Sequence, residues 1–168
     1  EYEPDGSTQG IQSMFDVLRG PLVELRAAVL EKEKPEALTS VFEIDQQMVL
    51  SRELALTFGY DFNRGRIDKA VHPFSSGSSS DVRITTRTVA KDPMNCFYST
   101  IHEVGHACYE QNINPDYAFT AFGQGCSLGI HESQSRIYEN QLGRSRGFTG
   151  YLYSRMVDMF GDFGVKDE

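Results

Sequence analysis

Residues 93–111 read PMNCFYSTIHEVGHACYEQ and hold an H-E-x-x-H pattern near their centre. Asp92-Pro93 is typical of a helix start, because proline is favoured in the first turn, and we expect one helix over the whole stretch. Residues four apart lie on one face of a helix, about one turn from each other. His102 and His106 are therefore predicted to direct neutral imidazole nitrogens at one metal ion.

Glu103, the second residue of the pattern, is predicted to be the catalytic base. It lies about 100° around the helix from His102, so it cannot easily join the same set of ligands. It can still reach a water molecule at the metal, which is where a general base is needed. The competing interpretation is a chance match on a surface helix, which we expect in about one per cent of chains of this length.

A catalytic zinc site needs a third protein ligand and an open position. The longer pattern H-E-x-x-H-x-x-G-x-x-H is excluded, since Tyr109 and Asn112 occupy its later positions. The alternative is a glutamate on a following helix, and Glu132 fits because a loop separates it from His106. Spacing alone leaves three competitors open, which are Glu110, Glu139 and His131.

The rest of the chain is predicted to be mainly helical with little strand. Residues 1–10 are expected to be irregular, as are 59–81 and 112–125. The alternation in DVRITTRTV, residues 81–89, predicts a strand. Apolar spacing and capping residues predict further helices from Ile11 with a kink or new start at Pro21, from Thr39 or Ser40 to Phe58, from Ser127 to Leu142, and over about 149–160.

Composition excludes some kinds of partner. The 168 residues carry a formal net charge of −8, which argues against nucleic acid, since phosphate binding needs clustered Lys and Arg. No apolar run is long enough to predict a membrane segment. The three cysteines, Cys96, Cys108 and Cys126, lack C-x-x-C spacing. They are expected to be reduced, buried thiols of a cytoplasmic protein.

Four segments together resemble the thermostable carboxypeptidase Taq family of metallocarboxypeptidases, in the family's order and with about its spacing. They are His72-Pro73-Phe74, Asp81-Val82-Arg83-Ile84-Thr85, His102-Glu103-Val104-Gly105-His106 and His131-Glu132-Ser133-Gln134. The resemblance implies a mainly α, helical zincin-like metalloprotease core with a small β-sheet, its strand near 82–89, beside the active-site groove.

The same resemblance implies the chemistry. His102, His106 and Glu132 would bind one divalent metal ion, zinc or cobalt, and Glu103 would be catalytic. The implied activity is removal of C-terminal residues from peptides, by a protein that is a homodimer at full length. Its rivals are an endopeptidase or aminopeptidase with the same core, and a metal-binding module without activity.

Two later motifs of the family are absent from the sequence. They are Ile/Val-Arg-x-x-Ala-Asp and Gly-x-x-Gln-Asp-x-His-Trp, and the chain has no Trp. The chain thus resembles about the middle third of a family member, and it is expected to be one partial catalytic domain. Its expected parts are a helical scaffold (1–60), a loop and strand segment (61–92), the metal-site helices (93–145) and a further helix with the end (146–168). Because the expected arginine clamp for the substrate carboxylate is missing, this chain alone is predicted to be inactive.

Four more residues are candidates for substrate contact or support of the site. His72 precedes a proline and is expected either to pack in a turn or to lie in the groove. His131 precedes a predicted ligand and is expected to hydrogen-bond the substrate or Glu103. Asp81 and Arg83 are expected to pair with each other as structural support.

Overall fold

The computed structural model describes residues 5–34 and 37–165. They divide into two compact units, Glu1–Ala37 and Leu38–Glu168. Parts of the predicted first loop and of the predicted C-terminal end, 1–4 and 166–168, lie outside the described residues. None of the described helices combines the length and the apolar character needed to cross a bilayer.

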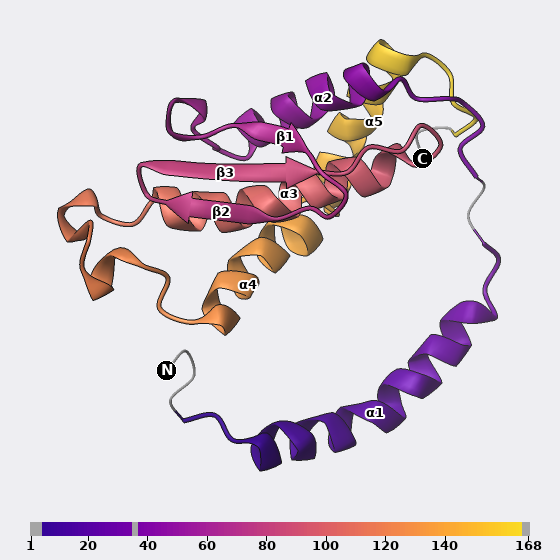
Figure 1. Ribbon diagram of the computed structural model, residues 1–168. Helices are drawn as coiled ribbons and strands as arrows, with labels where there is room; N and C mark the ends of the chain where they lie inside the picture. Colours follow the sequence, from indigo (N-terminus) through magenta and orange to yellow (C-terminus); the bar gives the residue numbers. More distant parts are fainter. Residues whose placement is uncertain (1–4, 35–36, 166–168) are drawn as a thin grey trace. The chain divides into compact units, whose positions relative to one another are not determined.

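The first unit contains one helix, α1 (Thr8–Leu30) (Figure 1). The predicted helix is confirmed but starts three residues earlier, because the Ser7 side chain caps it by accepting from the Gly10 amide at 3.0 Å. Pro21 lies inside this helix and does not open a second one. No residue of α1 is buried, so its apolar side chains remain exposed.

The second unit contains a three-stranded sheet of β1 (Ile67–Lys69), β2 (Ser75–Ser78) and β3 (Asp81–Thr86), in the order β1-β3-β2. The predicted strand is confirmed as β3 but ends at Thr86. Its alternating residues Val82, Ile84 and Thr86 are buried. β1 pairs with β3 in parallel and β2 in antiparallel. Both of these strands lie where irregular chain was predicted.

The helices of this unit are α2 (Ile44–Thr57), α3 (Pro93–Gln111), α4 (Leu128–Arg136) and α5 (Arg146–Phe160). A π-helical stretch, η4 (Ile137–Leu142), continues α4, and three short 3₁₀ turns are η1 (Phe62–Arg64), η2 (Pro115–Tyr117) and η3 (Ala121–Gly123). The structure confirms a mainly helical fold with a small sheet. The predicted bounds of α3 are confirmed, with Asp92 as its cap.

Two smaller predictions are wrong. Thr39 and Ser40 do not cap α2, because the Thr39 amide bonds the Phe163 carbonyl and the Ser40 hydroxyl bonds that of Asp162, so the helix begins only at Ile44. Cys126 is exposed in the loop before α4, where its Sγ lies 3.3 Å from the Tyr109 hydroxyl oxygen, whereas Cys96 and Cys108 are buried as expected.

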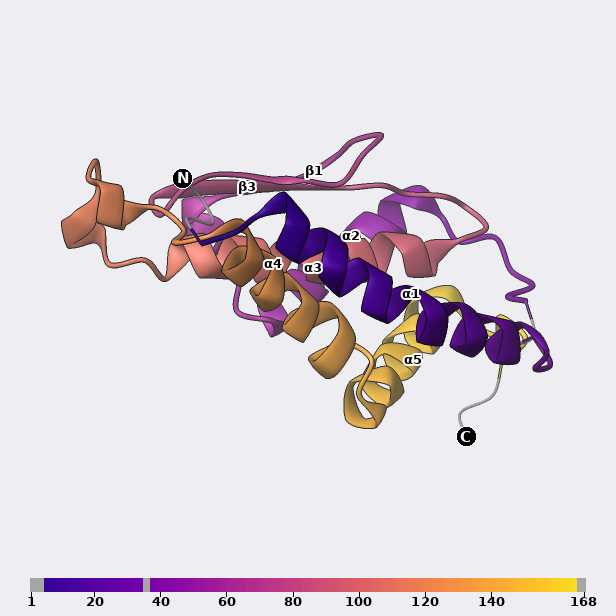
Figure 2. The same cartoon turned by 90° about the horizontal axis from the view of Figure 1, so that it is seen from below.

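Helix α3 is held on several sides (Figures 1 and 2). Its Val104 and Ala107 pack in one core cluster with Val82 and Ile84 of β3. Its N-terminal half packs in a second cluster with α2, α5 and the segments that flank them. The buried members of this cluster are Phe42, Leu50, Leu54, Cys96, Phe97, Ile101, Leu152, Met156 and Phe163. Figure 2 shows the sheet on one side of α3 and α4 on the other. The helix that carries the H-E-x-x-H pattern is therefore rigidly placed.

Candidate metal centre

Three side chains meet where α4 crosses α3. His106 Nε2 lies 3.2 Å from Glu132 Oε2, and His102 Nε2 lies 3.6 Å from the same oxygen. One ligand atom from each of these residues falls within 4.8 Å of the other two. Two imidazole nitrogens and a carboxylate oxygen are a donor set that suits a divalent metal such as zinc. The residues present therefore fit the metal that the sequence pattern implies.

Gly105 allows the two helices to come this close. A Cβ atom added at Gly105 would lie only 2.6 Å from the Cα atom of Ser135, so the α4 backbone packs directly on this residue of α3. Ser127 fixes the start of α4, because its side chain accepts from the Ile130 amide at 3.0 Å. The H-E-x-x-H helix and the Glu132 helix are thus set against each other by main-chain packing.

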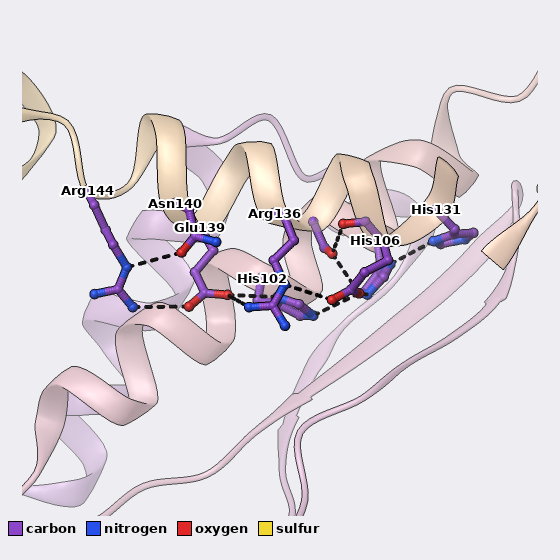
Figure 3. A network of polar contacts seen from close by, with 9 residues as sticks. His102, His106, His131, Arg136, Glu139, Asn140 and Arg144 are labelled. Carbon is purple, nitrogen blue, oxygen red and sulfur yellow. Dashed lines mark hydrogen bonds and ion pairs between the residues drawn. The ribbon is translucent and has the colours of Figure 1, made fainter. Parts of the chain in front are cut away.

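The three competitors for the third-ligand position lie outside the centre, and Figure 3 shows two of them, Glu139 and His131. Glu139 Oε2 contacts His102 Nδ1 at 2.9 Å. His131 Nδ1 contacts His106 Nδ1 at 2.7 Å, and His131 Nε2 contacts Glu110 Oε1 at 2.8 Å. Each competitor therefore lies behind a histidine ring, on the side away from Glu132.

Two neighbours on α4 hold the Glu132 carboxylate. Arg136 Nε donates to Oε1 at 2.8 Å, and the Ser135 hydroxyl donates to Oε2 at 3.0 Å. Partial burial opposes ionisation of Glu132, but these two hydrogen bonds and the nearby positive charges outweigh it, and its pKa is lowered. The carboxylate therefore stays ionised, as a metal ligand must be.

Glu103 is buried, with 7% of its surface exposed. Burial raises its pKa to about 7, and the negative charge of Glu132 adds to the rise. Burial also lowers the pKa of His106 to about 4, helped by His102 and His131. At neutral pH His106 is therefore uncharged, and Glu103 is poised to take up and release a proton.

Two grooves flank the centre, and Glu103 lines both. The larger, of about 720 Å³, is lined by His72, Pro73, Asp92, Met94, Asn95, Tyr98, Ser99, His102, Glu103, Arg136, Glu139 and Arg144. The smaller, of about 480 Å³, is lined by Pro73, Phe74, Ser75, Glu103, His106, Leu128, His131 and Glu132. His72 thus lies in the larger groove and His131 in the smaller.

Asp81 and Arg83 are placed differently. Arg83 Nη2 lies 2.7 Å from Asp81 Oδ2, both side chains are more than half exposed, and neither residue lines these two grooves. Arg136 and Arg144 line the larger groove, a position that no motif of the sequence predicted. The contact of Arg136 with Glu132 could have been predicted, because residues four apart on a helix are neighbours.

Comparisons with known proteins agree with this geometry. A family model described as carboxypeptidase Taq (M32) metallopeptidase matches residues 1–168. Carboxypeptidase 1 of Bacillus subtilis is 37% identical over 99% of this chain and 35% of its own length. Thermostable carboxypeptidase 1 of Thermus thermophilus is 37% identical over 97% of this chain and 33% of its own length.

A solved structure gives the same result. The crystal structure of an M32 carboxypeptidase from Deinococcus radiodurans matches 97% of this chain and 34% of its own, with a TM-score of 0.91 and 39% sequence identity. The chain therefore spans about a third of the length of the relatives that it matches.

Proposed function

This chain belongs to the carboxypeptidase Taq (M32) family of metallopeptidases, and we propose that it carries the hydrolytic centre of a metallocarboxypeptidase that releases C-terminal residues from peptides. The observation that carries the proposal is the meeting of His102, His106 and Glu132 beside the buried Glu103. A metal-binding module without activity would not need a buried acid at this position.

In this proposal, His102, His106 and Glu132 hold one divalent metal ion, with zinc or cobalt as the native ion. When bound, such an ion polarises the carbonyl of the bond to be cleaved and makes a water molecule more acidic. Metal analysis of the purified protein tests the identity of the ion. More than one equivalent, or none, would contradict the single site.

Glu103 is the proposed general base and general acid. Its carboxylate accepts a proton from the attacking water and then donates that proton to the leaving amine. Efficient transfer in both directions needs a pKa near the working pH, and burial raises the pKa of Glu103 to about 7. Because Glu103 lines both grooves, it can face a peptide that runs from one groove to the other.

The remaining candidates have more distant roles. His72 and His131 are proposed to contact the substrate or its surroundings from the larger and the smaller groove. Asp81 and Arg83 are proposed to brace the start of β3, since they pair with each other outside both grooves. The arginine expected to bind the terminal carboxylate belongs to a motif that this sequence does not contain.

The test is Glu103→Gln in the full-length protein, assayed on unblocked and C-terminally amidated peptides. The change preserves shape and removes the base, so turnover should fall at least about a hundredfold while the metal content is retained. Near-normal turnover would contradict the role of Glu103. Faster cleavage of the amidated peptide would favour an endopeptidase or aminopeptidase instead.

A cytoplasmic location and a homodimer are also proposed, each from a single observation. Cys96, Cys108 and Cys126 are all free thiols, which supports a reducing compartment and hence the cytoplasm. A homodimer rests on the family resemblance alone. Light scattering tests it, and a monomeric full-length protein at working concentration would contradict it.

A further inference from the structure

The outer contact of His102 assigns its tautomer. A neutral imidazole has one N–H donor and one acceptor nitrogen, whereas a carboxylate only accepts. Glu139 Oε2 lies 2.9 Å from His102 Nδ1, so Nδ1 carries the hydrogen and donates it. The lone pair is then on Nε2, the nitrogen that faces Glu132 Oε2.

His106 is held in the same Nδ1–H tautomer, but through the ring of His131. Glu110 Oε1 accepts from His131 Nε2 at 2.8 Å, so in a neutral His131 the other nitrogen, Nδ1, is an acceptor. His131 Nδ1 lies 2.7 Å from His106 Nδ1, which must therefore donate. The lone pair of His106 is again on Nε2, 3.2 Å from Glu132 Oε2.

We propose that Glu139 and Glu110 are positioning residues that hold both histidines in the Nδ1–H tautomer, Glu139 directly and Glu110 through His131. The inference rests on the proposed ligand set. By sequence spacing, Glu139 and Glu110 were competitors of Glu132 for the metal. In this proposal they instead fix the direction of the histidine lone pairs. Carboxylates behind metal-binding histidines commonly fix ring orientation and make the ligand more basic.

Glu139 is firmly held. Arg136 Nη1 donates to its Oε2 at 3.2 Å and Arg144 Nη2 to its Oε1 at 3.1 Å (Figure 3). The Arg144 guanidinium in turn lies over the Tyr98 ring, 4.1 Å from its centre. Only 15% of the Glu139 side chain is exposed. Arg136 also binds Glu132, so one guanidinium joins the proposed ligand carboxylate to the positioning carboxylate.

The His131 relay is held as well. The Tyr109 ring packs against His131 with the ring centres 4.8 Å apart. A Cβ atom at Gly125 would lie 2.8 Å from His131 Cδ2, so the loop backbone closes over the imidazole. Glu110 has 16% of its side chain exposed. The ring therefore has little freedom to turn away from His106.

The test measures zinc affinity by competition with a chelator, in the full-length protein and in Glu139→Gln and Glu110→Gln. Each change removes the negative charge and adds a donor that competes with the required tautomer. The zinc Kd should rise about tenfold to a hundredfold in each variant. Because the two residues act on different histidines, the double variant should show the product of the two single effects.

Two further readouts separate positioning from a merely structural role. The visible spectrum of the cobalt-substituted protein should change in both variants, because the ligand field depends on ring orientation. The matched control is Glu53→Gln, which removes a carboxylate paired with Arg155 between α2 and α5. It should leave both the zinc Kd and the cobalt spectrum unchanged.

The outcomes are distinct. Wild-type affinity in both glutamine variants would overturn the inference, while loss of zinc in His106→Ala would leave the proposed ligand set intact. Retention of zinc by His106→Ala would overturn the ligand set, and the inference with it. If Glu139→Gln does not fold, Arg144→Gln loosens Glu139 from further out. An unchanged Kd in that variant would overturn the role of Glu139.

Discussion

At the scale of single residues, the centre is built so that each proposed ligand keeps one atom toward the metal position and has a partner on the opposite atom. Glu132 binds Arg136 through Oε1, and His102 binds Glu139 through Nδ1. Such contacts reduce the reorganisation that metal binding requires. The preorganisation of the metal site therefore depends on neighbouring residues such as Arg136 and Glu139 as much as on the ligands.

Arg136→Gln should make metal binding more sensitive to acid. The pKa of Glu132 is lowered because hydrogen bonds from Ser135 and Arg136 outweigh the effect of burial, so removal of the guanidinium should raise it. Protons then compete with the metal at a higher pH. Zinc affinity measured from neutral pH downward should fall earlier in the variant. Superimposable pH curves would show that Arg136 does not control this carboxylate.

Helical spacing was enough to single out the H-E-x-x-H residues, because it determines which side chains share a face, whereas the choice of Glu132 over its competitors rested on the family resemblance. The sequence could not assign Glu110 and Glu139, since hydrogen bonds to the outer ring nitrogens depend on rotamers and on the packing of two helices. His131 was expected to contact the substrate or Glu103, and its contact with His106 follows only from the crossing of α3 and α4.

At the scale of elements, local signals explain what could be predicted. Asp92-Pro93 marks the start of α3, and alternation marks β3. Strand β2 has the sequence SSGS, which has no strand pattern, and it forms because Ser75 and Gly77 pair with Ile84 and Val82. The change from α-helix to π-helix at Ile137 was likewise not predictable from apolar spacing.

Gly105→Ala should weaken both the fold and the metal site. The new methyl group would meet main-chain atoms of α4 at Ser135, 2.6 Å away, and a backbone cannot move aside cheaply. Overpacking of this kind costs about 1–3 kcal/mol, and displacement of α4 moves Glu132 as well. Chemical denaturation and zinc titration should both report the loss.

The matched control for this change is Gly150→Ala on α5. Nothing lies within 4 Å of a Cβ atom at Gly150, and alanine is favoured over glycine inside a helix. This variant should be as stable as the wild type or more stable. Equal behaviour of the two alanine variants would contradict the close approach of α3 and α4.

The ion pair between α2 and α5 makes a pH-dependent contribution to stability. Glu53 accepts from Arg155 Nε at 2.6 Å and from the Tyr151 hydroxyl at 2.8 Å. The hydrogen bond from Arg155 lowers the pKa of Glu53 below 4.5, against the opposing effect of burial. The contribution is therefore complete above the ordinary pKa and is lost as the pH falls through the lowered one.

Glu53→Gln should thus reduce the free energy of unfolding by about 1 kcal/mol at neutral pH, a value discounted for partial exposure. The difference from the wild type should shrink as the pH falls below 4.5. Unfolding curves at several pH values check this. A difference that does not depend on pH would mean that the ionised carboxylate is not the stabilising form.

At the scale of the whole molecule, the chain spans about a third of the length of its relatives. Its expected activity therefore depends on which functional groups this third contains. Residues 1–168 supply the proposed ligands and the proposed base. They lack the motif expected to bind the terminal carboxylate of the substrate. Missing positioning groups can reduce rates by orders of magnitude even when the reacting groups are present.

Residues 1–168 assayed alone, loaded with metal, should therefore hydrolyse unblocked peptides far more slowly than the full-length relative from Bacillus subtilis. Metal content measured on the same samples ensures that the comparison concerns substrate binding and not loss of the ion. Comparable rates would contradict the prediction. Arg136 and Arg144, which line the larger groove, would then be the first residues to substitute in a search for the clamp.

The most direct measurement is a structure of the zinc-bound protein, with the ion located by anomalous scattering. We expect a single ion with Nε2 of His102, Nε2 of His106 and one Glu132 carboxylate oxygen as ligands, each at about 2.0–2.2 Å. Glu139 and Glu110 should remain in their present places, behind the rings. An oxygen of Glu139 or Glu110 bound to the ion in place of Glu132 would contradict the proposed centre.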